Sequence, residues 1–116
     1  MEKKNFSKPD EIRALPKTKL EIVTLAGSQL MKSTFEPGWK WSENVKPTVG
    51  TESCQTHHVI YAISGRMKVV MEDGAELEFG PDDIIDIPAG HDAWVIGEEQ
   101  AVGLDMGGAT TYAKPS

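Results

Sequence analysis

Side chains able to bind a metal or move a proton gather in one short stretch of the chain. Glu52, Cys54 and His58 follow one another closely, and His91 comes later. Carboxylate, thiolate and imidazole are all acceptable ligands for zinc or iron, and a cysteine ionises when it binds a metal. Without a metal, a histidine among apolar walls can hydrogen-bond an organic ligand or accept a proton from it. These four residues are therefore candidate ligands of a metal or of a small molecule.

The two neighbouring histidines are not equivalent candidates. A strand is expected over 55–63, and adjacent side chains on a strand point to opposite faces. His57 and His58 therefore cannot both line one cavity without a β-bulge. A cysteine nucleophile at Cys54, activated by a histidine, is the weaker alternative because no oxyanion-hole motif accompanies it.

Two tryptophans precede this stretch, in Gly38-Trp39-Lys40-Trp41. They lie two residues apart, which places them on one face of an extended segment. Trp41 could wall a pocket for a planar or apolar ligand. Equally, both rings could close the interior of the fold or be buried in a dimer contact, and the structural role is slightly favoured.

The elements that must position these residues are short strands. Glycine and Pro/Asp turns divide the chain into β-branched and aromatic runs, the pattern of an all-β sandwich or barrel. Glu72-Asp73-Gly74-Ala75 is a hairpin signal of type I′, and Ser7–Leu15 alone favours a short helix. The strands are expected at Leu20–Leu25, Leu30–Phe35, Gln55–Ile63, Met67–Met71, Ala75–Phe79, Ile84–Ile87, Asp92–Ile96 and Ala101–Met106.

The order of the central turns resembles the cupin superfamily. The segment 50–65 resembles the first cupin motif, G-x5-H-x-H-x3-4-E-x6-G, and 80–90 resembles the second, G-x5-P-x-G-x2-H-x3-N. The resemblance implies a small single-domain cupin: an all-β, jelly-roll β-barrel over residues 18–110. It is preceded by an extension with a short helix at 1–17 and followed by a tail at 111–116.

The resemblance implies where metal ligands would stand, and this chain departs from the pattern. None of the family's ligand positions keeps its expected residue type, although His91 could reach in from the turn in place of the last histidine. The positions fall on Glu52, Cys54, His58 and Ala93, or with the longer motif spacing on Thr51, Ser53, His58 and Ala93.

Two interpretations of that departure stay open. In the first, the metal site is degenerate, no cofactor is bound, and the barrel mouth holds a small molecule through Glu52, Cys54, His58, His91 and Trp41. In the second, Glu52, Cys54, His58 and His91 form a rebuilt site for a divalent transition metal, Zn, Fe, Mn or Ni. The chain would then be a metal-dependent enzyme of the oxygenase, isomerase or decarboxylase type.

Composition restricts the partners and the compartment. The chain has 116 residues, a formal net charge of −6 and a pI near 5.0, which argues against nucleic acid and anionic membranes as partners. Its single cysteine and the lack of a visible signal peptide predict a cytoplasmic protein. The family resemblance implies a homodimer.

Overall fold

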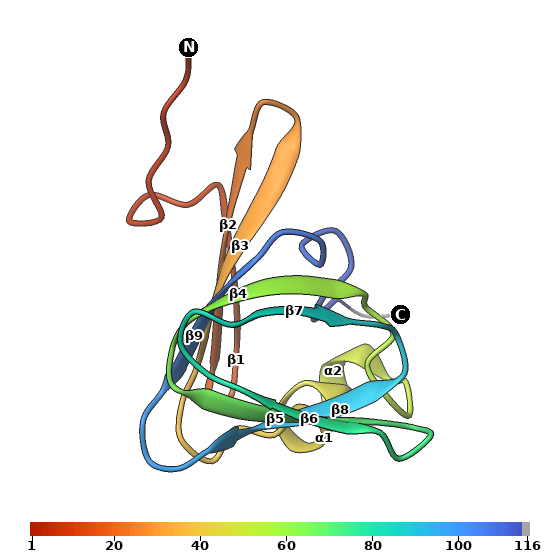
Figure 1. Ribbon diagram of the computed structural model, residues 1–116. Helices are drawn as coiled ribbons and strands as arrows, with labels where there is room; N and C mark the ends of the chain where they lie inside the picture. Colours follow the sequence, from red (N-terminus) through yellow and green to blue (C-terminus); the bar gives the residue numbers. More distant parts are fainter. Residues whose placement is uncertain (115–116) are drawn as a thin grey trace.

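The protein consists of two antiparallel β-sheets with two short helices at one end (Figure 1). The computed structural model describes residues 1–114. The larger sheet has the strand order β1-β2-β3-β9-β4-β7, and the smaller has the order β6-β5-β8. The strands are β1 (Glu11–Leu15), β2 (Thr18–Leu25), β3 (Ser28–Phe35), β4 (His58–Ser64), β5 (Arg66–Met71), β6 (Glu76–Phe79), β7 (Ile84–Ile87), β8 (His91–Ile96) and β9 (Ala101–Asp105).

The core lies between the two sheets, as the alternating strands predict. In β8, Ala93 and Val95 are buried while Trp94 is half-buried on the other face. The same period-two pattern directs apolar side chains of both sheets inward. They form one continuous cluster that includes Leu20, Ile22, Met31, Phe35, Val69, Ile85 and Ile87. The all-β class predicted from the sequence is confirmed.

The β5–β6 hairpin forms where it is expected, with a different turn. Gly74 has a positive φ of 93°, whereas Asp73 does not. Gly74 N donates to Met71 O at 2.9 Å and Met71 N donates to Ala75 O at 2.8 Å. One left-handed glycine after a tight turn is the three-residue hairpin pattern, so the type I′ prediction is wrong.

The helix expected over Ser7–Leu15 is also wrong, because this segment ends in strand β1. Residues 11–15 pair with β2 in an unbroken register from Glu11↔Ile22 to Leu15↔Thr18. An isolated two-turn helix is marginal because its nucleation is costly, whereas the hairpin supplies backbone partners directly. Lys17, with a φ of 58°, closes the connecting turn.

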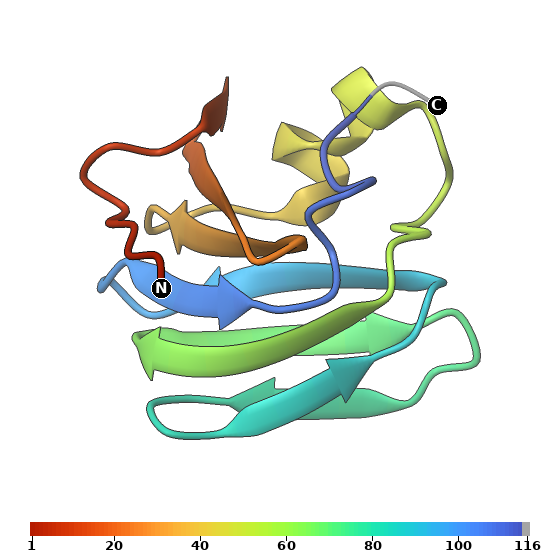
Figure 2. The same cartoon turned by 90° about the horizontal axis from the view of Figure 1, so that it is seen from above.

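The helices lie instead between β3 and β4. They are α1 (Trp41–Asn44) and α2 (Lys46–Val49). Proline in the first turn of α2 and Gly50 at its C-terminus, with a φ of 85°, fit a short helix and its stop. The helices and the last described residues lie at the same end of the sheets (Figures 1 and 2).

The segment 111–116 is expected to follow the barrel as a C-terminal tail, and its described part packs against the core. Tyr112 and Ala113 are buried against the core cluster, while residues 115 and 116 lie outside the described residues. Among residues 1–114, no helix is both long and apolar enough to cross a membrane.

Candidate functional site

The ends of three strands and one loop meet at the end of the molecule that carries the helices. His58 begins β4, His91 begins β8 and Asp105 ends β9. Cys54 lies in the loop before β4 and pairs with the start of β8, where its N donates to His91 O at 2.7 Å. This isolated bridge brings the cysteine and the second histidine together although they are distant in sequence.

Cys54, His58 and His91 form one buried cluster. One donor atom from each, the sulfur and one nitrogen of each ring, lies within 4.8 Å of the other two. The Cys54 Sγ is 3.7 Å from His58 Nε2. The two imidazole rings lie edge to face, with centroids 5.3 Å apart. A soft sulfur and two ring nitrogens so close together can converge on a single ion.

Each histidine of the cluster is oriented by a hydrogen bond from its Nδ1. His58 Nδ1 donates to Asp105 Oδ2, and His91 Nδ1 donates to Pro88 O at 2.7 Å. Both rings therefore present Nε2 toward Cys54. A carboxylate or carbonyl behind the distal nitrogen is the usual support of a metal-binding histidine.

Asp105 is itself held firmly. Its side chain is buried, and its Oδ1 accepts hydrogen bonds from Gly107 N at 2.9 Å and Gly108 N at 2.8 Å. A Cβ at Gly108 would stand 2.5 Å from Asp105 Oδ2 and 2.7 Å from His58 Nδ1. Glycine is therefore required at 108 by close approach to this pair.

The cluster stabilises the charged forms of its members. Burial opposes ionisation of Cys54, but hydrogen bonds with His58 and His91 outweigh it and lower the thiol pKa to about 6. Burial likewise opposes protonation of His58, but hydrogen bonds with Asp105 and Cys54 raise its pKa to about 9. In the metal-free protein the same hydrogen bonds favour the thiolate form of Cys54 and the imidazolium form of His58.

The donor set and its supports fit a divalent transition metal. Zinc and iron accept thiolate and imidazole together, and three protein ligands leave a coordination position for water or substrate. The thiolate that a metal requires is already favoured in the folded chain. The residues present therefore meet the chemical demands of such a site.

The structure brings together three of the four metal ligands expected from the sequence. Cys54, His58 and His91 converge, but Glu52 does not, because its side chain is 96% exposed and pairs with Lys46 at 3.3 Å. His57 faces outward and contacts Asp86, as the alternation predicts.

Sequence reasoning missed Asp105 and Tyr112 as parts of the site. In β9 the alternation of buried Ala101 with its neighbours places Asp105 on the inner face, and an inward carboxylate is a signal for a partner. Nothing in the local sequence indicates that Tyr112 folds back over His58, with ring centroids 4.8 Å apart and an angle of 83° between the rings.

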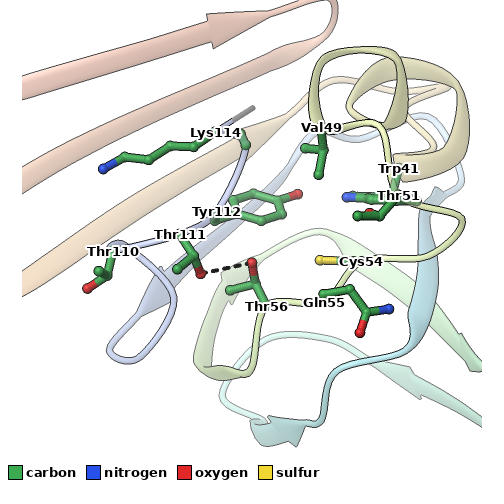
Figure 3. Close-up of a pocket in the computed structure, with 11 residues that line it drawn as sticks. Trp41, Val49, Thr51, Cys54, Gln55, Thr56, Thr110, Thr111, Tyr112 and Lys114 are labelled. Atoms are coloured by element: carbon green, nitrogen blue, oxygen red, sulfur yellow. Dashed lines mark hydrogen bonds between the residues drawn. The ribbon is translucent and has the colours of Figure 1, made fainter. Parts of the chain in front are cut away.

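A pocket of about 350 Å³ opens beside the cluster (Figure 3). Cys54, Trp41 and Tyr112 are part of its wall, together with Val49, Thr51 and Thr56. Trp41 and Tyr112 also line a small interior cavity of about 40 Å³ that reaches His58 and His91. The same two rings therefore lie between the pocket and the histidines, and Trp41 is part of the pocket wall; its predicted contact with a ligand stays a prediction.

Trp39 has the structural role. Its indole nitrogen donates to Thr18 Oγ1 at 2.8 Å, and its ring stacks on Phe35 with centroids 4.0 Å apart. The two tryptophans that look alike in the sequence thus differ in their contacts, although both belong to the core cluster.

No protein-family model matches this sequence, and no curated protein does. Solved structures do resemble it. One of unknown function from Rhizobium leguminosarum bv. viciae is 20% identical with a TM-score of 0.65, covering 100% of this chain and 98% of that one. A cupin-like protein from Thermotoga maritima is 14% identical with a TM-score of 0.55, covering 78% and 68%. The polyketide cyclase RemF from Streptomyces resistomycificus is 18% identical with a TM-score of 0.62, covering 90% and 77%. At these identities the likenesses show the fold alone, and that fold is cupin-like.

Proposed function

We propose that this cupin-fold protein binds a divalent transition metal through Cys54, His58 and His91 and accepts a small molecule in the adjoining pocket. The observation that carries the proposal is the buried convergence of three donor atoms within 4.8 Å, with both histidines fixed from behind. One thiolate and two imidazoles favour zinc or iron over manganese.

The chain's own residues give such a metal a defined setting. Asp105 fixes the tautomer and tilt of His58, and Tyr112 covers that ring from the pocket side. A bound metal would supply a Lewis acid with an open coordination position. Chemistry of the oxygenase, isomerase or decarboxylase type is therefore compatible with the site.

A second candidate function is metal-free binding of a small molecule. The contact between Cys54 Sγ and His58 Nε2 favours it, because a thiolate–imidazolium pair is a satisfied arrangement without any ion. In that case the pocket beside the pair would hold an organic ligand without redox chemistry.

Metal content separates the two candidates. The untagged protein, purified without added metal, is analysed for zinc, iron, manganese and nickel alongside His91→Ala and His57→Ala. We expect about one metal ion per chain in the wild type and in His57→Ala, and loss of that metal in His91→Ala. Substoichiometric metal in the wild type, with no uptake on adding zinc, would support metal-free binding instead.

A further inference from the structure

The indole nitrogen of Trp41 is a buried donor without an acceptor. Trp41 is only 1% exposed, and its Nε1 is the one buried side-chain nitrogen or oxygen in residues 1–114 that has no hydrogen-bond partner. An indole N–H can only donate, and buried donors in native proteins are almost always paired. The indole nitrogen of Trp39, by contrast, donates a hydrogen bond to Thr18 Oγ1, so this fold can supply an acceptor to a buried indole.

The residue that carries the unpaired donor, Trp41, is part of the wall of the 350 Å³ pocket. In Figure 3 the Trp41 nitrogen lies on the side that faces Tyr112, and the Cys54 sulfur borders the same hollow. Its size is at the lower end of the range of small-ligand sites. A ligand in this pocket that carries an oxygen acceptor would give Trp41 the partner that the chain itself lacks.

The rest of the wall indicates the chemistry of that ligand. Val49, Tyr112 and Ala113 are apolar surface suited to a hydrocarbon body. Within the described chain the wall contains one lysine, Lys114, and no carboxylate. When a metal offsets the negative charge of the Cys54 thiolate, the charge of the wall favours an anion over a cation.

We propose that the pocket binds a small carboxylic acid with an apolar body, whose carboxylate oxygen accepts a hydrogen bond from Trp41 Nε1. This inference rests on the proposed function, because it names the ligand class of the pocket next to the metal cluster. A metal held by Cys54 would place a further positive charge at the same side of the pocket. A neutral or cationic molecule of similar size lacks the negative charge that a metal held by Cys54 would attract, so it should bind more weakly.

Three probes of similar size and different charge test the inference. Benzoate, benzyl alcohol and benzylammonium are titrated into the ¹⁵N-labelled full chain, and the indole N–H resonances of its three tryptophans are followed. Trp41→Phe assigns the Trp41 signal. If that variant does not fold, Thr18→Val and Trp94→Phe assign the other two signals and leave the Trp41 signal by elimination.

Benzoate is expected to shift the Trp41 resonance saturably, with a Kd of about 1 mM or below. Benzyl alcohol should bind at least about tenfold more weakly, a difference of about 1.4 kcal/mol, and benzylammonium should bind less well than the alcohol. The Trp39 resonance serves as the internal control because its donor is already paired. No saturable Trp41 shift with benzoate, or an equal response to the alcohol or the cation, would overturn the inference.

The titration is performed on zinc-loaded and on metal-free protein, with zinc content measured on both. Zinc binding without a benzoate response refutes the ligand class and leaves the metal site standing. A benzoate response in a protein that takes up no zinc keeps the pocket assignment and refutes the metal part of the proposed function.

Discussion

Asp105 fixes the orientation of the buried His58 ring. It is one of the most buried side chains of the protein, and its two oxygens have separate tasks. Oδ1 accepts hydrogen bonds from two backbone N–H groups, while Oδ2 accepts one from His58 Nδ1. The backbone contacts hold the carboxylate in place without any metal. The orientation of the His58 ring is therefore already fixed in the folded chain.

Asp105→Asn should therefore weaken metal binding. The amide keeps the size of the side chain but loses the charge that fixes and polarises His58, and loss of such a support lowers metal affinity by about 10- to 100-fold. Asp86→Asn is the matched control, because Asp86 contacts the outward His57 in the same manner. Zinc affinity is measured by competition with a chelator. Equal losses in the two variants would mean that Asp105 does not act through His58.

The charged pair gives the metal-free protein a defined pH dependence. The raised pKa of His58 stabilises the fold below pH 6.5 and loses that effect as pH rises through about 9. The lowered pKa of Cys54 acts in the opposite sense: its contribution is present above pH 9 and is lost as pH falls through about 6. Between pH 6.5 and 9 in the wild type, the stabilisation from His58 decreases with rising pH while the stabilisation from Cys54 increases, so the two changes partly cancel.

Cys54→Ser removes one side of this balance. The variant's free energy of unfolding should fall as pH rises from 6.5 to 9, because Asp105 still favours protonated His58. The metal-free wild type should change less over the same interval. Urea denaturation at a series of pH values provides the measurement. Parallel pH profiles for the two proteins would show that Cys54 carries no thiolate in the fold.

At the scale of elements, the turn after β9 is packed directly against the site. Gly107 and Gly108 follow Asp105, yet their surroundings differ. A Cβ at Gly107 would meet ordinary contacts, the nearest at 3.6 Å, whereas one at Gly108 would overlap the Asp105–His58 pair. The end of β9 thus allows no side chain at the second glycine.

Gly108→Ala should cost about 1–3 kcal/mol in the free energy of unfolding, because the added methyl group displaces buried neighbours. The substitution should also weaken zinc binding, because the added methyl group displaces Asp105 Oδ2 and His58 Nδ1. Gly107→Ala is the control and should leave zinc binding close to the wild type. Zinc affinity unaffected by both substitutions would contradict the close approach described for residue 108.

The segment after β9 covers the cluster and is tied to β1. Arg13 Nη1 donates to Tyr112 O at 2.8 Å, so the first strand holds the residue that stands over His58. Arg13 also pairs with Glu11, whose carboxylate is more exposed. The strand that the sequence misassigned as helix therefore contributes to closing the site.

Arg13→Ala should loosen this cover at a cost of about 1 kcal/mol, the usual worth of one hydrogen bond. The expected result is a severalfold faster reaction of Cys54 with a thiol reagent in the metal-free protein, because local opening governs access to a buried group. Glu11→Gln removes the exposed ion pair and keeps the bond to Tyr112, so its rate should stay near that of the wild type. An unchanged rate in Arg13→Ala would show that Tyr112 is held by its packing alone.

At the scale of the whole molecule, strands and turns were predictable because they depend on local patterns. Alternation located the inward face of β8, and glycines marked the loops. The turn type at Gly74 and the strand β1 were not predictable, because pairing with another segment decides them. The homodimer implied by the cupin resemblance stays a prediction.

The site was predictable only in part, for a similar reason. Chemistry-bearing residue types indicated Cys54, His58 and His91, but spacing could not reveal that Glu52 points into solvent. Asp105 and Tyr112 reach the cluster from the far end of the chain, through strand pairing and the return of the last segment. Such long-range placement has no signature in the local sequence.

In the proposed function, the Cys54 sulfur and the two imidazoles of His58 and His91 bind a single metal ion. X-ray absorption of the zinc-loaded protein tests it directly, because zinc–sulfur and zinc–nitrogen distances differ, at about 2.3 Å and about 2.0–2.1 Å. We expect one sulfur and two imidazole nitrogens bound to the zinc ion in the wild type, and loss of the sulfur in Cys54→Ser. A shell of nitrogen and oxygen only, identical in the wild type and in Cys54→Ser, would contradict it.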